Sequence, residues 1–241
     1  METNDNFYPM PRIGDSAPAF KAETTKGPIS FPEDFKGRWV ILFSHPGDFT
    51  PVCTSEFMIF GDMYRQFKER NCELLGLSVG SIGSHIAWLR TIKEKIEYRG
   101  IKNLTIQFPL IEDLSMEISR SYGMIQPAQS TTKTVRTVFF IDPKGIVRAS
   151  INYPMVLGRN MQEIMRVLVG LQTIDKYSVA LPADWQEGDE VITAAGGTFE
   201  NANRHMDNPS DGEKCYDWFF CIKKLPVGEK EEKKRQTVAV E

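Results

Sequence analysis

The sequence predicts an α/β domain in which helices flank a mixed central sheet, followed by a loop-rich carboxyl-terminal appendage. Up to about residue 176, apolar runs typical of buried strands alternate with segments of helical periodicity. After that point glycine and proline interrupt any period. We therefore divide the 241 residues into a main domain, 1–176, and an extension, 177–241, whose last part, 229–241, begins with charges typical of a solvated tail.

The composition is that of an ordinary globular protein, with 41% hydrophobic and 25% charged residues, which excludes wholesale disorder. A net charge of −3 provides no long-range attraction to nucleic acid or to anionic lipid. The apolar runs are far shorter than the roughly 18 residues that span a bilayer. The amino terminus is acidic and lacks an apolar signal segment. We therefore expect a cytoplasmic protein without membrane or nucleic-acid partners.

The first half of the main domain contains two predicted strands, each followed by a helix. Trp39–Ser44 is an almost wholly apolar run between turn residues, which is typical of a strand buried on both faces. A helix follows over residues 50–70, because aromatic residues recur there at steps of three and four. A second buried strand at 73–79 and a charged helix at 84–98 come next.

The second half adds two more strands, a hairpin and a helix. Apolar runs at 108–111 and 137–142 indicate strands. Residues 142–145 read Asp-Pro-Lys-Gly, which favours a turn, so residues 146–153 form the second arm of a hairpin. A hairpin next to strands that alternate with helices makes the sheet mixed. The last helix is expected over 160–175.

The chain has four cysteines, Cys53, Cys72, Cys215 and Cys221. In a long cytosolic chain the thiols are kept reduced, so catalytic or redox chemistry is expected ahead of a disulfide framework. Cys72 stands at the entry of a predicted strand and is expected in the core.

Cys53 follows a buried strand and a loop, in the first turn of the next predicted helix. The positive end of the helix dipole and the unpaired backbone N–H groups there favour an anion. They are expected to lower the pKa of the thiol from its free value of about 8.5, which makes a reactive thiolate. The alternative is that Cys53 is a small buried apolar residue, the usual situation of a free cysteine.

Pro46, Thr50 and Cys53 form the pattern Pro-x-x-x-Thr-x-x-Cys, and here the sequence resembles the peroxiredoxins, thiol-dependent peroxidases with a thioredoxin-like fold. Arg136 opens a later strand, where the family has an arginine over the reactive sulfur, and Arg159 resembles a second family position near the site. The resemblance covers nearly the whole chain. It implies reduction of hydrogen peroxide and organic hydroperoxides through a sulfenic acid on Cys53.

The resemblance gives each side chain a role that its chemistry can perform. Arg136 has fixed donors and a permanent charge, so it can stabilise both the sulfur and the departing oxygen; the alternative is a surface arginine paired with a carboxylate. The Thr50 hydroxyl can orient the peroxide, although it is equally well placed as a helix cap. Pro46 presents no N–H group and closes the pocket against water.

Three further residues complete the candidate site. Arg159 is expected among the substrate-binding residues. His45 is expected to contact oxidised sulfur or a substrate oxygen, with a hydrogen-bonded structural histidine as the alternative. Glu56 lies in the first turns of the same helix and is expected to hold an arginine in position.

The extension contains Cys215-Tyr-Asp-Trp-Phe-Phe-Cys221. A long appendage resembles the one-cysteine peroxiredoxins, and this pattern is similar to archaeal long-form members, in which a carboxyl-terminal cysteine of the neighbouring subunit forms the disulfide. By that resemblance Cys221 is the resolving thiol and Cys215 a second thiol that exchanges with it. The alternatives are packing residues or weak metal ligands. A Cys-x5-Cys pair with only His205 nearby is poor zinc spacing, so no metal or cofactor is expected.

Resolution across subunits implies at least a homodimer, and the family often builds a pentamer of dimers. The aromatic residues around Trp218 suit such an interface. Recycling of the disulfide requires a dithiol donor, either thioredoxin-like or a related protein disulfide oxidoreductase.

Two other functions remain open from the sequence. Gly76-Leu-Ser78-Val-Gly80 fits the Gly-x-Ser-x-Gly pattern of serine hydrolases, with His85 or His205 downstream, but Ser78 falls inside a strand instead of on a turn after it. The stretch around Ser16 lacks the closing glycine of that pattern. The other alternative is a holdase chaperone with a thioredoxin fold.

Overall fold

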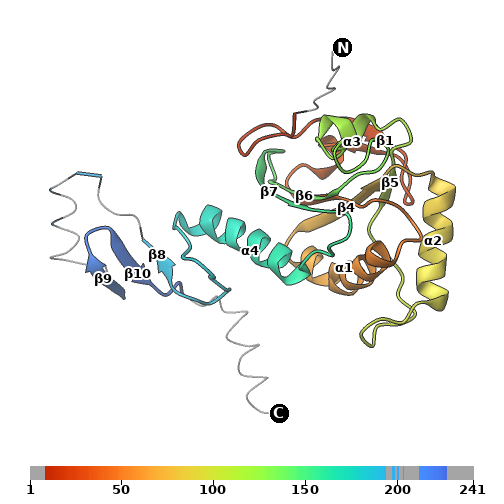
Figure 1. Cartoon of the computed structure of the whole chain (residues 1–241). Coiled ribbons are helices and arrows are strands. Elements are labelled where there is room, and N and C mark those ends of the chain that lie inside the picture. The colour runs from red at the N-terminus through yellow and green to blue at the C-terminus, as the bar shows by residue number, and fades with distance from the viewer. Residues whose placement is uncertain (1–8, 194–196, 199, 201–202, 204–211, 227–241) are drawn as a thin grey trace. The chain divides into compact units, whose positions relative to one another are not determined.

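A computed structural model describes residues 9–193, 197–198, 200, 203 and 212–226 (Figure 1). The chain divides into two compact units, residues 1–161 and 162–241. The helix that the sequence assigns to the end of the main domain therefore lies in the second unit. The charged tail at 229–241 and His205 lie outside the described residues.

The first unit is built on a five-stranded mixed sheet with the strand order β5-β4-β3-β6-β7. Its strands are β3 (Trp39–Ser44), β4 (Cys72–Ser78), β5 (Leu110–Glu112), β6 (Arg136–Ile141) and β7 (Val147–Tyr153). β3, β4 and β5 are parallel, whereas β6 pairs antiparallel with β3 and β7. The amino end of β6 therefore lies beside the carboxyl end of β3.

Helices α1 (Pro51–Glu69) and α2 (Ile82–Lys95) lie on one side of this sheet, as Figure 1 shows. Phe43 of β3 packs there against Phe57 and Phe60 of α1, with ring centroids 5.7 and 4.5 Å apart. The other side carries the hairpin of β1 (Phe20–Ala22) and β2 (Ile29–Phe31), the short 3-10 helix η1 (Glu33–Phe35) and helix α3 (Glu117–Ser121). Burial on both sides explains why every residue of β3 is buried.

The second unit contains helix α4 (Met161–Tyr177, whose first residue belongs to the first unit) and a small antiparallel sheet. The sheet has the order β8-β10-β9, formed by β8 (Val191–Ile192), β9 (Glu213–Asp217) and β10 (Phe220–Lys223). The sequence indicated only loops after residue 177, because β8 has just two residues and β9 and β10 are short and carry charged residues that hide any alternation.

The predicted mixed α/β architecture is confirmed, with most elements within three residues of their expected bounds. The strand expected at 108–111 begins two residues later, after Pro109, which cannot donate a ladder hydrogen bond. The elements β1, β2, η1 and α3 were not predicted, because elements of three to five residues are too short to show a period.

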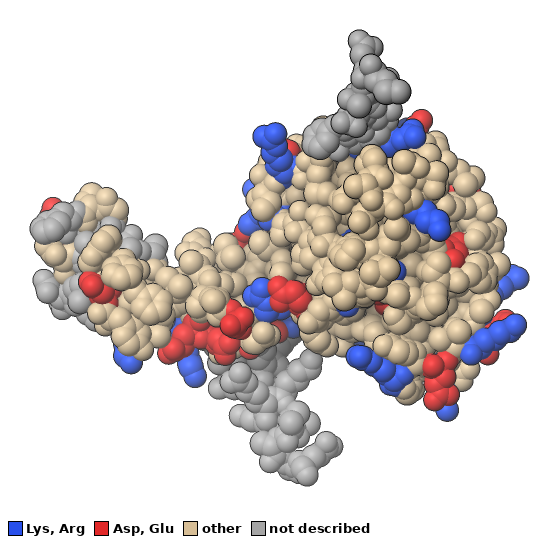
Figure 2. Space-filling view, in the orientation of Figure 1, with Lys and Arg blue, Asp and Glu red and all other residues tan. Residues whose placement is uncertain are grey.

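Lys and Arg side chains are interspersed with Asp and Glu on the face of the molecule in Figure 2. This mixed surface agrees with a net charge of only −3. Within the described part of the chain, no helix combines the length and the hydrophobicity that a bilayer crossing requires.

Candidate active site

The candidate site lies where β3 ends and β6 begins. Ser44, the last residue of β3, joins the two strands: its hydroxyl donates to the Val135 carbonyl oxygen (2.6 Å) and accepts from the Thr137 amide (3.1 Å). The loop over residues 45–50 then leads into α1. This antiparallel register brings Arg136 next to the start of α1, 83 residues away along the chain.

Cys53 is the third residue of α1, which begins with Pro51. Its side chain is fully buried, and its thiol is free. A proline at the first helical position is favourable because its missing N–H group would have no helical partner there. The sulfur therefore stands in the first helical turn, at the positive end of the helix dipole.

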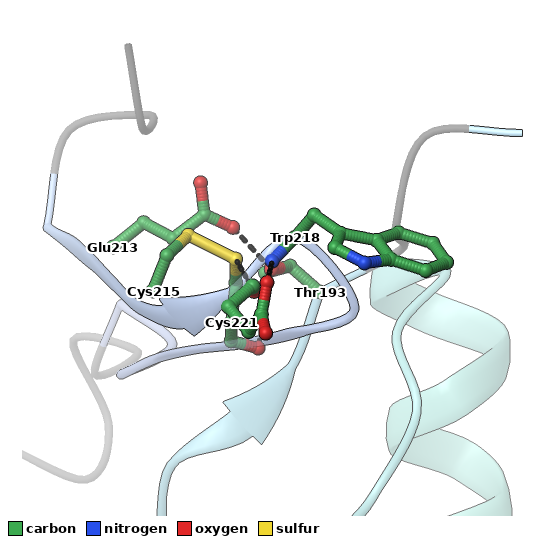
Figure 3. Close-up of a disulfide and its surroundings, with 6 residues drawn as sticks. Thr193, Glu213, Cys215, Trp218 and Cys221 are labelled. Atoms are coloured by element: carbon green, nitrogen blue, oxygen red, sulfur yellow. Dashed lines mark hydrogen bonds between the residues drawn. A yellow bond between two sulfur atoms is a disulfide. The ribbon is translucent and has the colours of Figure 1, made fainter. Parts of the chain in front are cut away.

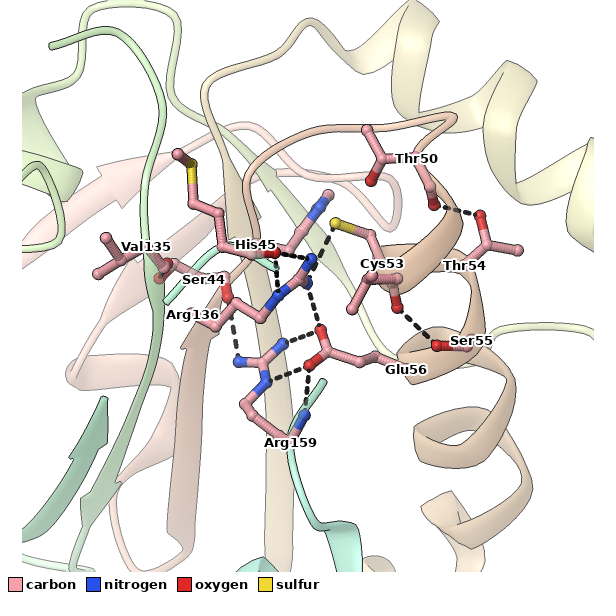
Figure 4. A network of polar contacts seen from close by, with 12 residues as sticks. Ser44, His45, Thr50, Cys53, Thr54, Ser55, Glu56, Val135, Arg136 and Arg159 are labelled. Carbon is pink, nitrogen blue, oxygen red and sulfur yellow. Dashed lines mark hydrogen bonds and ion pairs between the residues drawn. The ribbon is translucent and has the colours of Figure 1, made fainter. Parts of the chain in front are cut away.

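Arg136 is 2% exposed and lies directly against this sulfur (Figure 4). Its Nη1 donates to Cys53 Sγ (3.3 Å) and to Glu56 Oε2 (2.8 Å). Its Nε and Nη2 both donate to the Met155 carbonyl oxygen, at 2.9 and 2.7 Å. These contacts hold the plane of the guanidinium and direct one of its donors at the sulfur.

Glu56 joins the two arginines of the site. Besides its contact with Arg136, it accepts from the Nε (2.9 Å), the Nη2 (2.6 Å) and the backbone amide (2.9 Å) of Arg159. Arg159 Nη1 donates to the carbonyl oxygens of Ser44 and Thr137, at 3.0 and 3.2 Å. Arg159 therefore braces Glu56 and the strand ends in this structure, and a direct contact with substrate stays a prediction.

Thr50 precedes α1 at the N-cap position, but its side chain makes no capping hydrogen bond. The hydroxyl instead donates to the Gly47 carbonyl oxygen (2.9 Å) within the loop. The lone pairs of this oxygen are thus not used for capping. Pro46 is buried in the same loop, four residues before Thr50.

His45 is completely buried, and its ring packs against the rings of Phe57 and Trp88, with centroids 4.9 and 5.1 Å away. Neither ring nitrogen has a hydrogen-bond partner among the described residues; Nε2 lies 3.9 Å from Asp48 Oδ1. Burial lowers the pKa of His45 to about 3, although the Asp48 carboxylate acts in the opposite direction. The ring is therefore neutral at pH 7, and its predicted contact with sulfur or substrate stays untested.

Cys215 and Cys221 form a disulfide across β9 and β10, where the two residues are register partners (Figure 3). Cys221 is 2% exposed, whereas Tyr216, Trp218 and Phe219 are each about half exposed. A carboxylate oxygen of Glu213 lies within 4.8 Å of the two sulfur atoms. Sulfur atoms that are bonded to each other are not thiolates, so these three residues do not form a metal site in the disulfide state.

Cys72 and Ser78 lie away from this chemistry. Cys72 is buried in the core as expected; burial, with the nearby Glu73 carboxylate, raises the pKa of its thiol. Ser78 ends β4, is fully buried and has no hydrogen-bond partner among the described residues. The nitrogens of His85 face Asp48 and the Ile111 carbonyl oxygen instead of Ser78, which does not favour serine hydrolysis.

Sequence reasoning missed two parts of the site. The Met155 carbonyl oxygen is a backbone group, and no residue-type signal could have revealed it. The other part is Asp48, whose carboxylate is buried beside His45 and His85. His85 lies 37 residues after Asp48, and nothing in the sequence indicated that these two residues pair.

The chain matches the AhpC/TSA family over residues 13–150 and the C-terminal domain of 1-Cys peroxiredoxin over residues 170–204. A protein named peroxiredoxin from Methanosarcina mazei is 55% identical over 215 residues, which cover 89% of this chain and 98% of the relative. A peroxiredoxin from Aquifex aeolicus is 50% identical over 226 residues, covering 90% and 98%.

Solved structures of this kind are also similar. The yeast mitochondrial 1-Cys peroxiredoxin superposes with a TM-score of 0.77 at 36% identity, covering 90% of this chain and 100% of the other. A cysteine-to-serine mutant of peroxiredoxin 6 of Arenicola marina gives a TM-score of 0.76 at 31% identity, covering 90% and 99%. These matches confirm the predicted thioredoxin-like architecture.

Proposed function

The chain belongs to the AhpC/TSA family of peroxiredoxins and is a thiol-dependent peroxidase, and we propose that Cys53 is the sulfur that reduces the peroxide. One observation carries this assignment: Arg136 Nη1 donates to Cys53 Sγ at 3.3 Å, in the first turn of α1. A guanidinium cannot lose its proton in a protein, so this donor stabilises negative charge on the sulfur throughout the reaction.

In the proposed step the Cys53 thiolate attacks one peroxide oxygen and the O–O bond breaks. The second oxygen leaves as an alkoxide or hydroxide and takes up a proton, giving alcohol or water. Cys53 is oxidised to a sulfenic acid and the peroxide is reduced. Arg136 stabilises charge as it moves from sulfur to the leaving oxygen, and Thr50 accepts or donates a hydrogen bond to the bound peroxide.

Glu56 and Arg159 act on this step through Arg136. Both are buried, and their mutual hydrogen bonds leave Arg136 little freedom to turn away from the sulfur. Pro46 helps to keep water out of the pocket. His45 lies in the same loop as a neutral ring and is proposed to meet the substrate or the oxidised sulfur.

We assign the second half of the cycle to the carboxyl-terminal cysteines. Cys221 of the neighbouring subunit attacks the Cys53 sulfenic acid and releases water, which leaves a Cys53–Cys221 disulfide. Cys215 then attacks Cys221, which frees Cys53 and leaves a Cys215–Cys221 disulfide. The pairing of these two cysteines supports the exchange, because it is the bond that this last step would form.

A thioredoxin-type dithiol donor or a related protein disulfide oxidoreductase would reduce that disulfide. The proposed assembly is a homodimer, grouped into a pentamer of dimers. The half-exposed aromatic residues between Cys215 and Cys221 suit a subunit interface. The cytosolic location and the preferred peroxide stay predictions, and the family matches do not favour the chaperone alternative.

Substitution of Cys53 by serine tests the assignment. We expect C53S to lose peroxide consumption with a dithiol donor, while C72A, which removes a buried thiol outside the site, keeps it. Full turnover by a folded C53S protein would refute the proposed role and leave only a binding function.

A further inference from the structure

The loop over residues 45–50 carries the proposed peroxide contacts, and it needs support along its length. Its first residue is anchored to the sheet, since the His45 amide donates to the Leu77 carbonyl oxygen (2.9 Å) and its own carbonyl oxygen accepts from Thr134 Oγ1 (2.8 Å). Its last residue, Thr50, is anchored to α1 through its carbonyl oxygen, which accepts from the Thr54 amide at 3.0 Å.

Between these ends the backbone is strained. Phe49 has a φ of 55°, in the left-handed region that an aromatic residue rarely adopts. Such a conformation is unfavourable and persists only where surrounding contacts impose it. The Phe49 side chain is 57% exposed, so its own burial does not hold it in place.

Apart from the Thr50–Gly47 hydrogen bond within the loop, this part is held by Asp48, the residue before Phe49. Asp48 Oδ2 accepts from Ser84 Oγ (2.6 Å) and lies 2.8 Å from His85 Nδ1, and both partners belong to α2. The Asp48 side chain is 5% exposed and His85 is fully buried. Burial would raise the pKa of Asp48, but the hydrogen bonds from His85 and Ser84 lower it.

His85 continues this connection into the sheet. Its Nε2 lies 3.2 Å from the Ile111 carbonyl oxygen of β5. A carboxylate only accepts hydrogen bonds, so Nδ1 is the donor in the contact with Asp48. The loop is thus tied to α2 by buried contacts of the Asp48 carboxylate with His85 and Ser84.

The same face of α2 also contacts the helix that bears the sulfur. Trp88 lies three residues after His85, is buried, and donates from Nε1 to Thr54 Oγ1 (3.2 Å), the residue after Cys53. α2 therefore holds both the loop before Cys53 and the helical turn that contains it.

From this arrangement, and resting on the proposed role of Cys53, we infer that Asp48, Ser84 and His85 form a loop clamp that positions Thr50 and the sulfur for peroxide attack. The three residues touch neither the sulfur nor the peroxide, so they are positioning residues. Because a shift of about 1 Å in reacting groups can cost about a hundredfold in rate, loosening the clamp should slow the oxidation of Cys53.

The first test is the oxidation rate of Cys53 in D48N, an isosteric change that removes the charge. Stopped-flow tryptophan fluorescence after mixing with peroxide measures this step alone. We expect at least a tenfold lower second-order rate constant. The matched control is D142N: Asp142 is also buried and accepts hydrogen bonds from two backbone amides, but it follows the far end of β6. We expect it to react at the wild-type rate.

Thermal unfolding of the same proteins separates positioning from loss of stability. A folded D48N protein within twofold of the wild-type rate, or an equal slowing in D142N, would overturn the clamp. If D48N does not fold, S84A removes one hydrogen bond to Asp48, and an unchanged rate in S84A overturns it as well. Absence of Cys53 oxidation in the wild type would instead contradict the proposed function.

A spectroscopic readout tests the contact between His85 and Asp48 itself. Nitrogen-15 NMR of the histidine rings, assigned by comparison with H85Q, should show a proton on His85 Nδ1, and that signal should change in D48N. A His85 Nδ1 without a proton in the wild type would contradict the inferred clamp.

Discussion

The two cysteine regions of this chain place sulfur in opposite surroundings. Cys53 is free, fully buried and contacted by Arg136, which shares the buried Glu56 carboxylate with Arg159. Cys215 and Cys221 are bonded to each other on a short hairpin whose aromatic residues are half exposed. One region is built from buried charge, and the other is a hairpin with half-exposed aromatic residues, in which Cys221 itself is 2% exposed.

This difference teaches that activation and exchange require different structures. Stabilising a charge on sulfur needs donors that do not move and a site without competing water. Disulfide exchange needs access, because a second thiolate has to reach the sulfur. In the proposed cycle the first requirement falls to Cys53 in the first unit and the second to Cys215 and Cys221 in the second unit. Because Cys221 is 2% exposed, the hairpin has to open before a second thiolate reaches its sulfur.

The largest effect is expected from removal of one cysteine of the hairpin. C221S should lose turnover with a thioredoxin-type donor, since the Cys53 sulfenic acid then has no partner and accumulates. C215S is the matched variant: it should still form the disulfide with Cys53 but release it slowly. Non-reducing electrophoresis after one equivalent of peroxide distinguishes these outcomes. A normal intersubunit disulfide in C221S would assign resolution to Cys215.

Substitution of Glu56 by glutamine tests how far the buried site depends on charge. It leaves the guanidinium groups of Arg136 and Arg159 buried without their carboxylate. Removal of one partner from a buried ion pair typically costs about 3–5 kcal/mol, so we expect that loss in the free energy of unfolding.

Urea unfolding measures this loss, and E69Q provides the control. Glu69 pairs with Arg65 at an exposed position of the same helix, where an ion pair contributes less than about 1 kcal/mol. Equal destabilisation by E56Q and E69Q would show that the buried ion pairs of Glu56 stabilise the fold no more than an exposed ion pair does.

Replacement of Arg136 by lysine should slow oxidation of Cys53 by about 10²–10³-fold, the usual cost of losing one donor to a developing charge. Lysine keeps the charge, but its single nitrogen cannot contact Cys53, Glu56 and the Met155 carbonyl oxygen in the geometry of the guanidinium.

Stopped-flow oxidation measures this rate, and R148K is the control, because Arg148 lies on neighbouring β7 and pairs with Asp142 away from the sulfur. An R136K protein that reacts as fast as wild type would show that charge alone, without the fork of donors, is sufficient.

The central sheet was predictable because its strands are long apolar runs, and the position of Cys53 followed from the strand before it. Glu56 pairs with Arg136, which lies 80 residues later on β6, the antiparallel neighbour of β3. No local sequence pattern encodes such a pairing. The family resemblance predicted that Arg136 lies over the sulfur. For Glu56 the sequence predicted contact with an arginine, without indicating which one.

The hairpin of the second unit was not predictable in the same way. Its strands have four and five residues and contain Lys214 and Asp217, so neither length nor alternation identified them. The clamp residues were hidden for a different reason: His85 was noticed only for its distance from Ser78 in sequence, and its partner Asp48 lies 37 residues away.

The smallest effect is the pH dependence of stability that comes from His45. The described residues of the second unit contain no histidine. Its pKa is about 3 in the folded protein and about 6.5 in the unfolded chain. Below about pH 6.5 the unfolded chain therefore binds the extra proton, so stability present at neutral pH is lost as the pH falls.

At pH 5 the loss is about 2 kcal/mol, from roughly 1.5 pH units at about 1.4 kcal/mol each. Urea unfolding at the two pH values measures it, and H45F, which keeps a ring packed against Phe57 and Trp88, should lose less by that amount. Identical pH dependence in the two proteins would mean that His45 is not buried as a neutral ring, and the contrast between a fully buried first site and a hairpin with half-exposed aromatic residues would weaken accordingly.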